Sequence, residues 1–559
     1  MSSSINKQIQ KTEQLILHGE LRKALEIIEE GIRRKDISKE DMISFLLRKS
    51  ECVFYLGDFQ ESIQLANRVL KESEGLDNTL DQIDALFQKA WSLLSITETK
   101  ELEQIVKNGL KIITTTNLPE KKAFEEKAKL LYIEAFRIAL LGDFSKSFEL
   151  HQEGILLAEK SGNKYITALL IGNLGALHLH FDKPERSDEY TEKALAIATE
   201  MGYKFQIAFH SINLAAAKSF RRDFEQSIKL YEEAFALAEE IGSTFLLVGY
   251  YDLGNTYLLM FQLDKALESY KKSLTSLPLY EHITLPCIGY IYYLKYELEK
   301  AKEYYLKSLK ISERLSDNRT IADVLYNLIL ISIELGNVGK AQKYLDRLEE
   351  ISMETSFEYV KYRYHFASIL VLKISGDISN LGKAAELLKT FLKEKNLSSK
   401  LRLDGLYALL EIRLKELQLS ANKEVLEEVQ KRLNHLEIEA EDQEQKWLLA
   451  NVYRLQSQLS LVELNANKAI ELLQKAQAIA DEIDVGILKK EISEDKEKIE
   501  KQLAMWKNLQ EKNAPISETF KHVSLESIVK NIKEETVIEE KDKETGEIIE
   551  YRKLFALKI

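Results

Sequence analysis

The chain has 559 residues, a net charge of −12 and a hydrophobic fraction of 45%, so it can bury a sizeable core but has no surplus of Lys and Arg for a broad grip on nucleic acid. Five prolines and 22 glycines are few for this length, which favours long helices with short turns over the several ordinary domains that length alone suggests. No secretory signal follows Met1 and no apolar run reaches the ~18 residues of a membrane span, so we expect a cytoplasmic protein.

Predicted helices follow one another in pairs from residue 5 to residue 484, and the turn inside each pair recurs mostly every 38 to 40 residues. Glycine suits such a turn because a tight helix end often needs a positive φ, and the following Asp or Asn can cap the second helix. The turns begin at Gly19, Gly57, Thr97, Gly142, Asp182, Arg222, Phe261, Tyr296, Gly336, Gly376, Ser420 and Leu464.

A small residue recurs five positions after the start of these turns, where the second helix of each pair should cross the first closely. In the unit at Gly376, three extra residues shift this position to Ala384. A fixed offset over so many units indicates an internal repeat rather than a composition bias. The small residues are Ala24, Ser62, Ser147, Ser187, Ser227, Ala266, Ala301, Ala341 and Ala469.

The clearest unit matches the motif W-x2-L-G-x2-Y…A-x3-F…P position by position, with Tyr in the first and last aromatic slots. Its matching residues are Tyr250, Leu253, Gly254, Tyr257, Ala266, Tyr270 and Pro278. On these residues the chain resembles the tetratricopeptide repeat (TPR) family. The resemblance implies an all-α superhelix of about twelve helical hairpins over residues 5–484, strongest from about 128 to 348. Units of about 40 residues are similar to those of kinesin light chains, spindle-orientation adaptors and bacterial peptide-pheromone receptors.

The eighth unit is shorter, with an interval of 35 residues before Tyr296. We expect its first helix to start late, at Thr284-Leu285-Pro286, because proline is tolerated in a first helical turn.

Residues 485–512 form one more predicted helix with a single apolar stripe of Leu488, Ile492, Ile499, Leu503 and Trp506. We interpret it as a capping helix that covers the last repeat, with a partner-binding coiled coil as the alternative.

Residues 515–559 are expected to form a small α+β tail. A short helix should begin at Ser524, and a β-hairpin should pair Thr536–Lys541 with Glu547–Phe555. The hairpin either folds onto the solenoid or serves as a docking arm.

We find no motif for a phosphate loop, a metal-binding helix or a nucleophile elbow, and predict no catalytic residue, no metal site and no cofactor. The two cysteines, Cys52 and Cys287, are far apart and have no ligand spacing, so neither a disulfide nor a zinc site is expected. His178 occupies a slot that other repeats fill with tyrosine, and we interpret it as a packed side chain. We therefore expect that the chain is not an enzyme.

The resemblance implies that inner positions of the first helices form a concave groove. Asparagines can bond to a peptide backbone there, and aromatic side chains can form pockets. The alternative is that these residues only pack neighbouring helices. The predicted peptide-binding groove consists of Asn173, Asn213, Phe220, Tyr251, Asp252, Asn255, Tyr290, Tyr293, Tyr326 and Asn327.

The sequence thus favours a scaffold or adaptor that holds a peptide segment of a partner protein in this groove. The alternative is a peptide- or ligand-responsive regulator whose superhelix changes shape on binding. Either function implies protein or peptide partners, and neither involves nucleic acid or a membrane. The sequence carries no signal for an oligomeric state.

Overall fold

The computed structural model describes residues 2–511, 537–541 and 548–553, except residues 75, 77, 97, 99, 141–142, 182, 276–279, 356, 375–377, 395–398, 421–422, 443–444 and 463–464. Within these residues the chain forms 25 α-helices, one 3-10 helix and two short strands, which confirms the prediction of an all-α solenoid. Pro278, predicted to close one repeat, lies outside the described residues.

The helices of the first seven repeats alternate between a first and a second helix. Their bounds are α1 Ser2–Leu17, α2 Leu21–Ile32, α3 Lys39–Leu56, α4 Phe59–Glu72, α5 Thr79–Ser95, α6 Leu102–Thr115, α7 Glu120–Leu140, α8 Phe144–Ser161, α9 Lys164–His180, α10 Pro184–Met201, α11 Lys204–Phe220, α12 Phe224–Ile241, η1 Phe245–Val248, α13 Gly249–Leu259 and α14 Leu263–Leu274.

Within the described residues the remaining helices continue this alternation, and α25 follows the twelfth pair without a described second helix. Their bounds are α15 Glu281–Leu294, α16 Leu298–Leu315, α17 Asn318–Glu334, α18 Val338–Glu354, α19 Glu358–Ile374, α20 Ile378–Phe391, α21 Ser399–Ser420, α22 Lys423–Asp442, α23 Lys446–Val462, α24 Ala466–Glu482 and α25 Gly486–Glu511.

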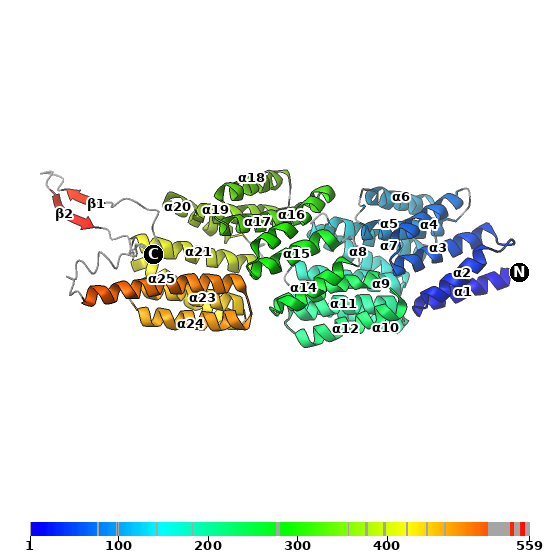
Figure 1. Cartoon of the computed structure of the whole chain (residues 1–559). Helices are drawn as coiled ribbons and strands as arrows, with labels where there is room; N and C mark the ends of the chain where they lie inside the picture. Colours follow the sequence, from blue (N-terminus) through cyan, green and yellow to red (C-terminus); the bar gives the residue numbers. More distant parts are fainter. Residues whose placement is uncertain are drawn as a thin grey trace. The chain divides into compact units, whose positions relative to one another are not determined.

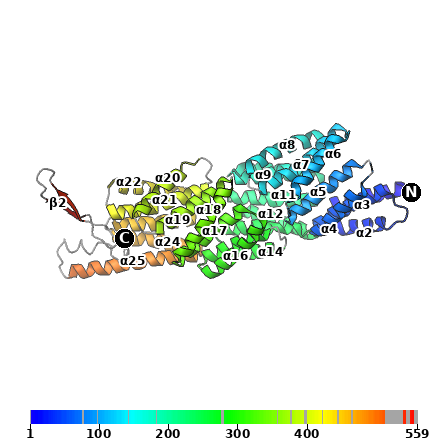
Figure 2. The same ribbon diagram turned by 90° about the horizontal axis from the view of Figure 1, so that it is seen from above.

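Each odd-numbered helix up to α23 is the first of a hairpin, and the next even-numbered helix packs against it (Figure 1). In the seventh repeat, η1 and α13 together take the place of the first helix. The view from above shows the same succession, with α25 beside α24 (Figure 2). Twelve hairpins are therefore formed, the number that the turns predicted.

The turns inside the hairpins have the backbone conformation that the glycines predicted. Gly57 ends α3 with φ of 92°, and the Asp58 side chain accepts a hydrogen bond from the Glu61 amide at the start of α4. The same left-handed conformation occurs at the equivalent turns without glycine, at Arg222 (φ 63°) and Tyr296 (φ 62°). The turn geometry is thus common to repeats whose sequences differ.

The small residues lie where the two helices of a hairpin cross. The Ser147 and Ser227 hydroxyls are buried and donate, each at 2.7 Å, to the carbonyls of Ala135 and Ala215 on the first helix. At Gly254, a Cβ atom would lie 2.5 Å from the Tyr270 ring. Close approach therefore requires small residues on both helices, as predicted.

The expectation for the eighth repeat is wrong. Helix α15 begins at Glu281, so Pro286 lies inside the helix and cannot donate to the carbonyl of His282. The Ser308 hydroxyl on α16 donates to that carbonyl instead, at 2.7 Å. A side chain from the partner helix thus replaces the lost backbone hydrogen bond, and the helix continues through the proline.

The chain divides into two compact units. Unit 1 consists of residues Met1–Ile288 and Leu306–Ile321, and unit 2 consists of residues Gly289–Tyr305 and Ala322–Ile559. The boundary passes through α15, α16 and α17, and each unit has its own interior. No helix in the described residues combines the length and apolarity needed to cross a bilayer.

Two strands follow the helices, β1 Val537–Lys541 and β2 Ile548–Lys553. They pair antiparallel, with Val537 opposite Lys553 and an irregularity between Glu540 and Lys541. The helix expected from Ser524 lies outside the described residues, so the tail as a whole stays a prediction.

Candidate functional site

The ten residues predicted to line the groove belong to two different units. Unit 1 holds Asn173, Asn213, Phe220, Tyr251, Asp252 and Asn255, and unit 2 holds Tyr290, Tyr293, Tyr326 and Asn327. The two sets have different surroundings.

In unit 1, Tyr251 and Asn255 lie one turn apart on α13 and contact tyrosines of neighbouring helices. The Tyr270 hydroxyl donates to Asn255 Oδ1 at 2.7 Å. The Tyr251 ring centroid lies 6.0 Å from that of Tyr270 and 5.8 Å from that of Tyr280. Asn255 therefore fixes Tyr270 within its own repeat, which is a packing role whether or not a ligand binds.

Asp252, between them on α13, is half-buried and forms no hydrogen bond or ion pair through its carboxylate with any described residue. Burial raises its pKa to about 7, because the charged form is poorly solvated there. Burial also raises the pKa of Tyr231 and of Tyr280, and the charge of Asp252 adds to both effects. The site therefore presents a carboxylate among tyrosines without a compensating cation, which a cationic group could supply.

Asn173 and Asn213 occupy the same position in successive repeats, on α9 and α11. The Nδ2 atoms of both are buried and donate to no described group. Burial raises the pKa of Tyr132, and a hydrogen bond with Asn173 opposes the shift. Phe220, at the end of α11, is 53% exposed and apart from this pair. The Asn213 amide thus has no described acceptor, whereas the Asn173 amide interacts with the Tyr132 hydroxyl.

In unit 2 the predicted residues are mostly engaged in packing. The ring centroids of Tyr290 and Tyr293 are 6.3 Å apart in a stacked arrangement on α15. The Tyr326 ring stacks on that of Phe366. The Arg363 guanidinium lies 4.9 Å from the centre of the Tyr326 ring.

Asn327 donates through Nδ2 to the Asp323 carbonyl of its own helix, 2.7 Å away. The Asn327 amide therefore donates to its own helix, which neither the Asn173 amide nor the Asn213 amide does.

The structure also brings together residues that the sequence reading did not single out. In unit 1, the Tyr203 hydroxyl between α10 and α11 lies 2.8 Å from Glu51 Oε1 and 2.8 Å from the Tyr55 hydroxyl, both on α3. The Tyr165 hydroxyl lies 3.2 Å from that of Tyr55. These polar groups join the second repeat to the fifth and sixth across the interior of the unit.

Next to this cluster, the second repeat packs directly against the seventh. The hydroxyl of Ser243 donates to the Tyr55 carbonyl at 2.6 Å, and that of Thr244 to the Leu56 carbonyl at 2.9 Å. The rings of Phe54 and Phe245 are 5.3 Å apart. The superhelix of unit 1 therefore closes on itself through a buried aromatic seam.

Unit 2 closes in an analogous place by different chemistry. At Gly486, the first residue of α25, a Cβ atom would lie 2.7 Å from the carbonyl oxygen of Lys295, at the end of α15. Lys490 forms an ion pair with Glu334 of α17 at 3.0 Å and lies 4.9 Å from the centre of the Tyr296 ring. As in unit 1, the turn of one repeat meets the helix that follows five repeats later.

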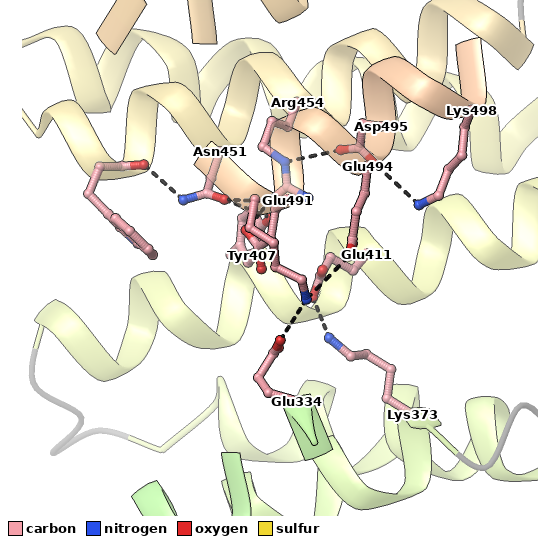
Figure 3. A network of polar contacts seen from close by, with 12 residues as sticks. Glu334, Lys373, Tyr407, Glu411, Asn451, Arg454, Glu491, Glu494, Asp495 and Lys498 are labelled. Carbon is pink, nitrogen blue, oxygen red and sulfur yellow. Dashed lines mark hydrogen bonds and ion pairs between the residues drawn. The ribbon is translucent and has the colours of Figure 1, made fainter. Parts of the chain in front are cut away.

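The inner side of α25 continues this contact as a polar network (Figure 3). Arg454 of α23 is 12% exposed, pairs with Glu491 and contacts Asp495 at 3.1 Å. Burial raises the pKa of Glu491, and Arg454 opposes the shift. Beside them Lys373 pairs with Glu411 at 2.6 Å. The network thus joins α17, α19, α21, α23 and α25.

The two closures differ in the kind of contact that they contain. An aromatic pair contributes ~0.5–1.5 kcal/mol beyond the burial of its surface. A partly exposed ion pair contributes ~0–1 kcal/mol, and a cation–π contact at such a site ~0.5–1 kcal/mol. The ion pair in the closure of unit 2 is therefore more sensitive to salt than the aromatic pair in the closure of unit 1.

The clefts found in the described residues lie elsewhere. A cleft of about 590 Å³ is lined by Leu406, Leu410, Glu427, Glu428, Lys431, Arg432, His435 and Leu436. Another, of about 270 Å³, is lined by Glu103, Val106, Lys107, Leu110, Leu130, Leu131, Glu134 and Leu150. Neither contains a residue of the predicted groove.

His178 has the packing role that its repeat position predicted. Its ring lies 5.3 Å from that of Phe148 and 5.2 Å from that of Tyr190. Burial lowers its pKa, which keeps it neutral at physiological pH.

The fold and these interiors define a tetratricopeptide-type helical repeat protein. Comparison with sequence families agrees, because residues 175–484 match the MalT-like TPR region. The chain belongs to this family. No curated protein sequence matches it significantly.

Three solved structures share the fold weakly. A Rap protein complexed with competence and sporulation factor is 16% identical over 63% of this chain and 98% of its own, with a TM-score of 0.45. The quorum sensor NprR from B. thuringiensis, in its apo form, is 17% identical over 64% and 99%, with a TM-score of 0.46. The STAND protein PH0952 from Pyrococcus horikoshii, which has a tetratricopeptide repeat sensor, is 16% identical over 64% and 56%, with a TM-score of 0.38.

Proposed function

We propose that this protein binds a segment of a partner protein on the inner helices of unit 1, and that the segment carries a Lys or Arg side chain that pairs with Asp252. The observation that carries the proposal is the half-buried Asp252 carboxylate, which has no cation among the described residues. The Asn213 amide supports it, since its Nδ2 donates to no described group and a peptide backbone offers acceptors to such a donor.

A cationic ligand gains from this site for a physical reason. The protein has already desolvated the carboxylate and keeps tyrosines around it, so an ammonium or guanidinium group would meet a poorly screened negative charge and aromatic rings. The proposal assigns no catalytic role to the chain. It places the protein in the cytoplasm, which fits two cysteines, Cys52 and Cys287, that form no disulfide with a described residue.

The role of scaffold or adaptor follows if the bound segment belongs to a larger partner. The second candidate is a regulator that changes shape on binding. The partly exposed ion pair of Lys490 and Glu334 in the closure of unit 2 favours that candidate, because a contact of this kind can open at low cost.

The test is a selection of random 12-residue peptides on the immobilised full-length protein, followed by binding measurements with the enriched synthetic peptides. We expect enrichment of Lys or Arg at one position. Asp252→Asn should weaken binding of those peptides ~10-fold or more, as for loss of a charged hydrogen bond.

The matched control is Glu225→Gln, which removes an exposed carboxylate of α12 and should leave binding unchanged. Peptides whose binding is indifferent both to their own cation and to Asp252→Asn would refute the proposed site.

A further inference from the structure

Helix α25 occupies the interior of unit 2 in the way that a bound helix would. Its residues Ile487, Leu488 and Ile492 are buried, and Glu491 and Asp495 lie in the polar network of Figure 3, while Lys490 pairs with Glu334. Every one of these three charges has a partner on an earlier helix, as given above. The contact is specific in shape as well as charge, because Gly486 meets the backbone of Lys295.

The equivalent helices of unit 1, η1 and α13, differ from α25 in their contacts and in their neighbours along the chain. There the turn of the second repeat contacts η1 and α13 of the seventh repeat, five repeats later. Phe245, Ser243 and Thr244 hold this contact in a buried seam. Helices η1 and α13 are also continuous with further repeats on both sides. Among the described residues, helix α25 has a hairpin on one side only, and its closing contacts combine buried apolar side chains with the ion pair of Lys490 and Glu334.

We propose that α25 is a reversible intramolecular latch, which occupies the inner face of unit 2 and uncovers it on release. The face beneath it is formed by Glu334, Lys373, Glu411 and Arg454, side chains of mixed charge. Such a face fits a helix with the pattern of α25: a glycine, a lysine four residues later, and carboxylates five and nine residues later. Two acids and one base at this spacing complement Arg454 and Glu334.

This inference bears on the regulated form of the proposed function, but it concerns a different unit from Asp252 and stands or fails independently. If α25 is a latch, a second copy of the helix supplied as a peptide should compete for the same face. If it is a fixed cap, the peptide should find no site.

The experiment uses the full-length protein and a fluorescein-labelled synthetic peptide of residues 485–511. Gly486→Ala adds a Cβ against the Lys295 carbonyl and should displace the start of α25. Gly382→Ala is the matched control, because nothing lies within 4 Å of a Cβ at that glycine of α20. We expect the peptide to bind the Gly486→Ala variant at least tenfold more tightly than the wild type or the control.

A second variant removes the charge contact without adding bulk. Lys490→Gln should also raise peptide binding, and hydrogen exchange in residues 486–499 should accelerate in both variants while α21–α24 stay protected. The latch would be refuted if neither variant binds the peptide, or if both lose protection in α21–α24 together with α25, since α25 would then be a structural cap.

Discussion

The hydroxyl of Tyr203 and the carboxylate of Glu51 are 2.8 Å apart, although 152 residues separate them in the chain. Tyr203 donates to the carboxylate, and the neighbouring Tyr55 hydroxyl, 2.8 Å from that of Tyr203, donates to the same carboxylate oxygen at 3.2 Å. This pair joins the second repeat to the sixth and makes the interior of unit 1 a closed one. Its strength can be measured.

Replacing Tyr203 by Phe should lower the free energy of unfolding by ~1–2 kcal/mol, because the Glu51 carboxylate loses a charge-assisted hydrogen bond. Glu51→Gln should cost less in that background than in the wild type, because only the contacts of Glu51 with Tyr55 and Arg48 remain to be lost. Tyr190→Phe is the control, since that ring stacks on His178 without a hydroxyl contact among the described residues. Urea unfolding measures the wild type, the two single variants, the double variant and the control, and fully additive losses would contradict the pairing.

The turn at Gly57 should tolerate no side chain. A Cβ atom there would lie 2.0 Å from Thr244 Oγ1, and φ is +92°, so Gly57→Ala carries both a collision and a conformational cost. Gly162→Ala has only the second cost, because its φ is +79° and nothing lies within 4 Å. We expect a loss of ~1 kcal/mol at Gly162 and ~2–4 kcal/mol at Gly57 from thermal or urea unfolding. Equal losses would mean that the closure of unit 1 is loose.

Asp252 makes stability depend on pH with a definite sign. The folded protein holds its proton up to about pH 7, whereas an unfolded aspartate releases it near about pH 4, so this group lowers the free energy of unfolding as pH rises between these values. Asp252→Asn should therefore be more stable than the wild type at pH 8, by ~1–3 kcal/mol after allowance for partial exposure, and equal to it near pH 4. A pH-independent difference in urea unfolding would count against an uncompensated carboxylate.

The same titration predicts how binding changes with pH. A peptide with a Lys or Arg side chain should bind more tightly at pH 8 than at pH 6, because Asp252 must be charged to pair with it. Isothermal titration at both values tests this, and Asp252→Asn should abolish the dependence. Tighter binding at pH 6 would exclude the carboxylate as the partner.

The two asparagines of the predicted groove should respond differently to truncation. Asn213→Ala removes a donor with no described partner, so it should weaken peptide binding with little change in stability. Asn255→Ala leaves the buried Tyr270 hydroxyl without its acceptor and should cost ~1–3 kcal/mol of stability. Identical behaviour of the two variants in unfolding and binding assays would show that the groove residues act only in packing.

Helix α15 offers a compensation test. Ser308→Ala should cost ~1–2 kcal/mol, because the His282 carbonyl loses the only donor seen for it in the described structure. In a Pro286→Ala background the restored backbone amide can supply that donor, so the same substitution should cost much less. A double-mutant cycle by urea unfolding measures the coupling, and its absence would mean that Ser308 does not serve the helix.

The candidate sites were only partly predictable. Asp252 could be named because the repeat motif fixes its position on an inner helix, but its lack of a cation depends on which side chains surround it. Asn327 shares the motif with Asn213, yet it bonds to its own helix at Asp323. The repeat position fixes where the backbone of a residue lies on its helix, but the neighbouring side chains decide which hydrogen bonds it forms.

The repeat itself is a property of the sequence. Turns such as Gly57-Asp58 and small residues such as Ser147 act within one hairpin, through backbone conformation and close helix contact, so each unit can be recognised alone. Only the tertiary structure decided the closures at Tyr203 and at Gly486, which join repeats five apart or nearly so. Each repeat rotates slightly against the last, and whether distant repeats meet depends on the sum of these small rotations, which no single repeat encodes.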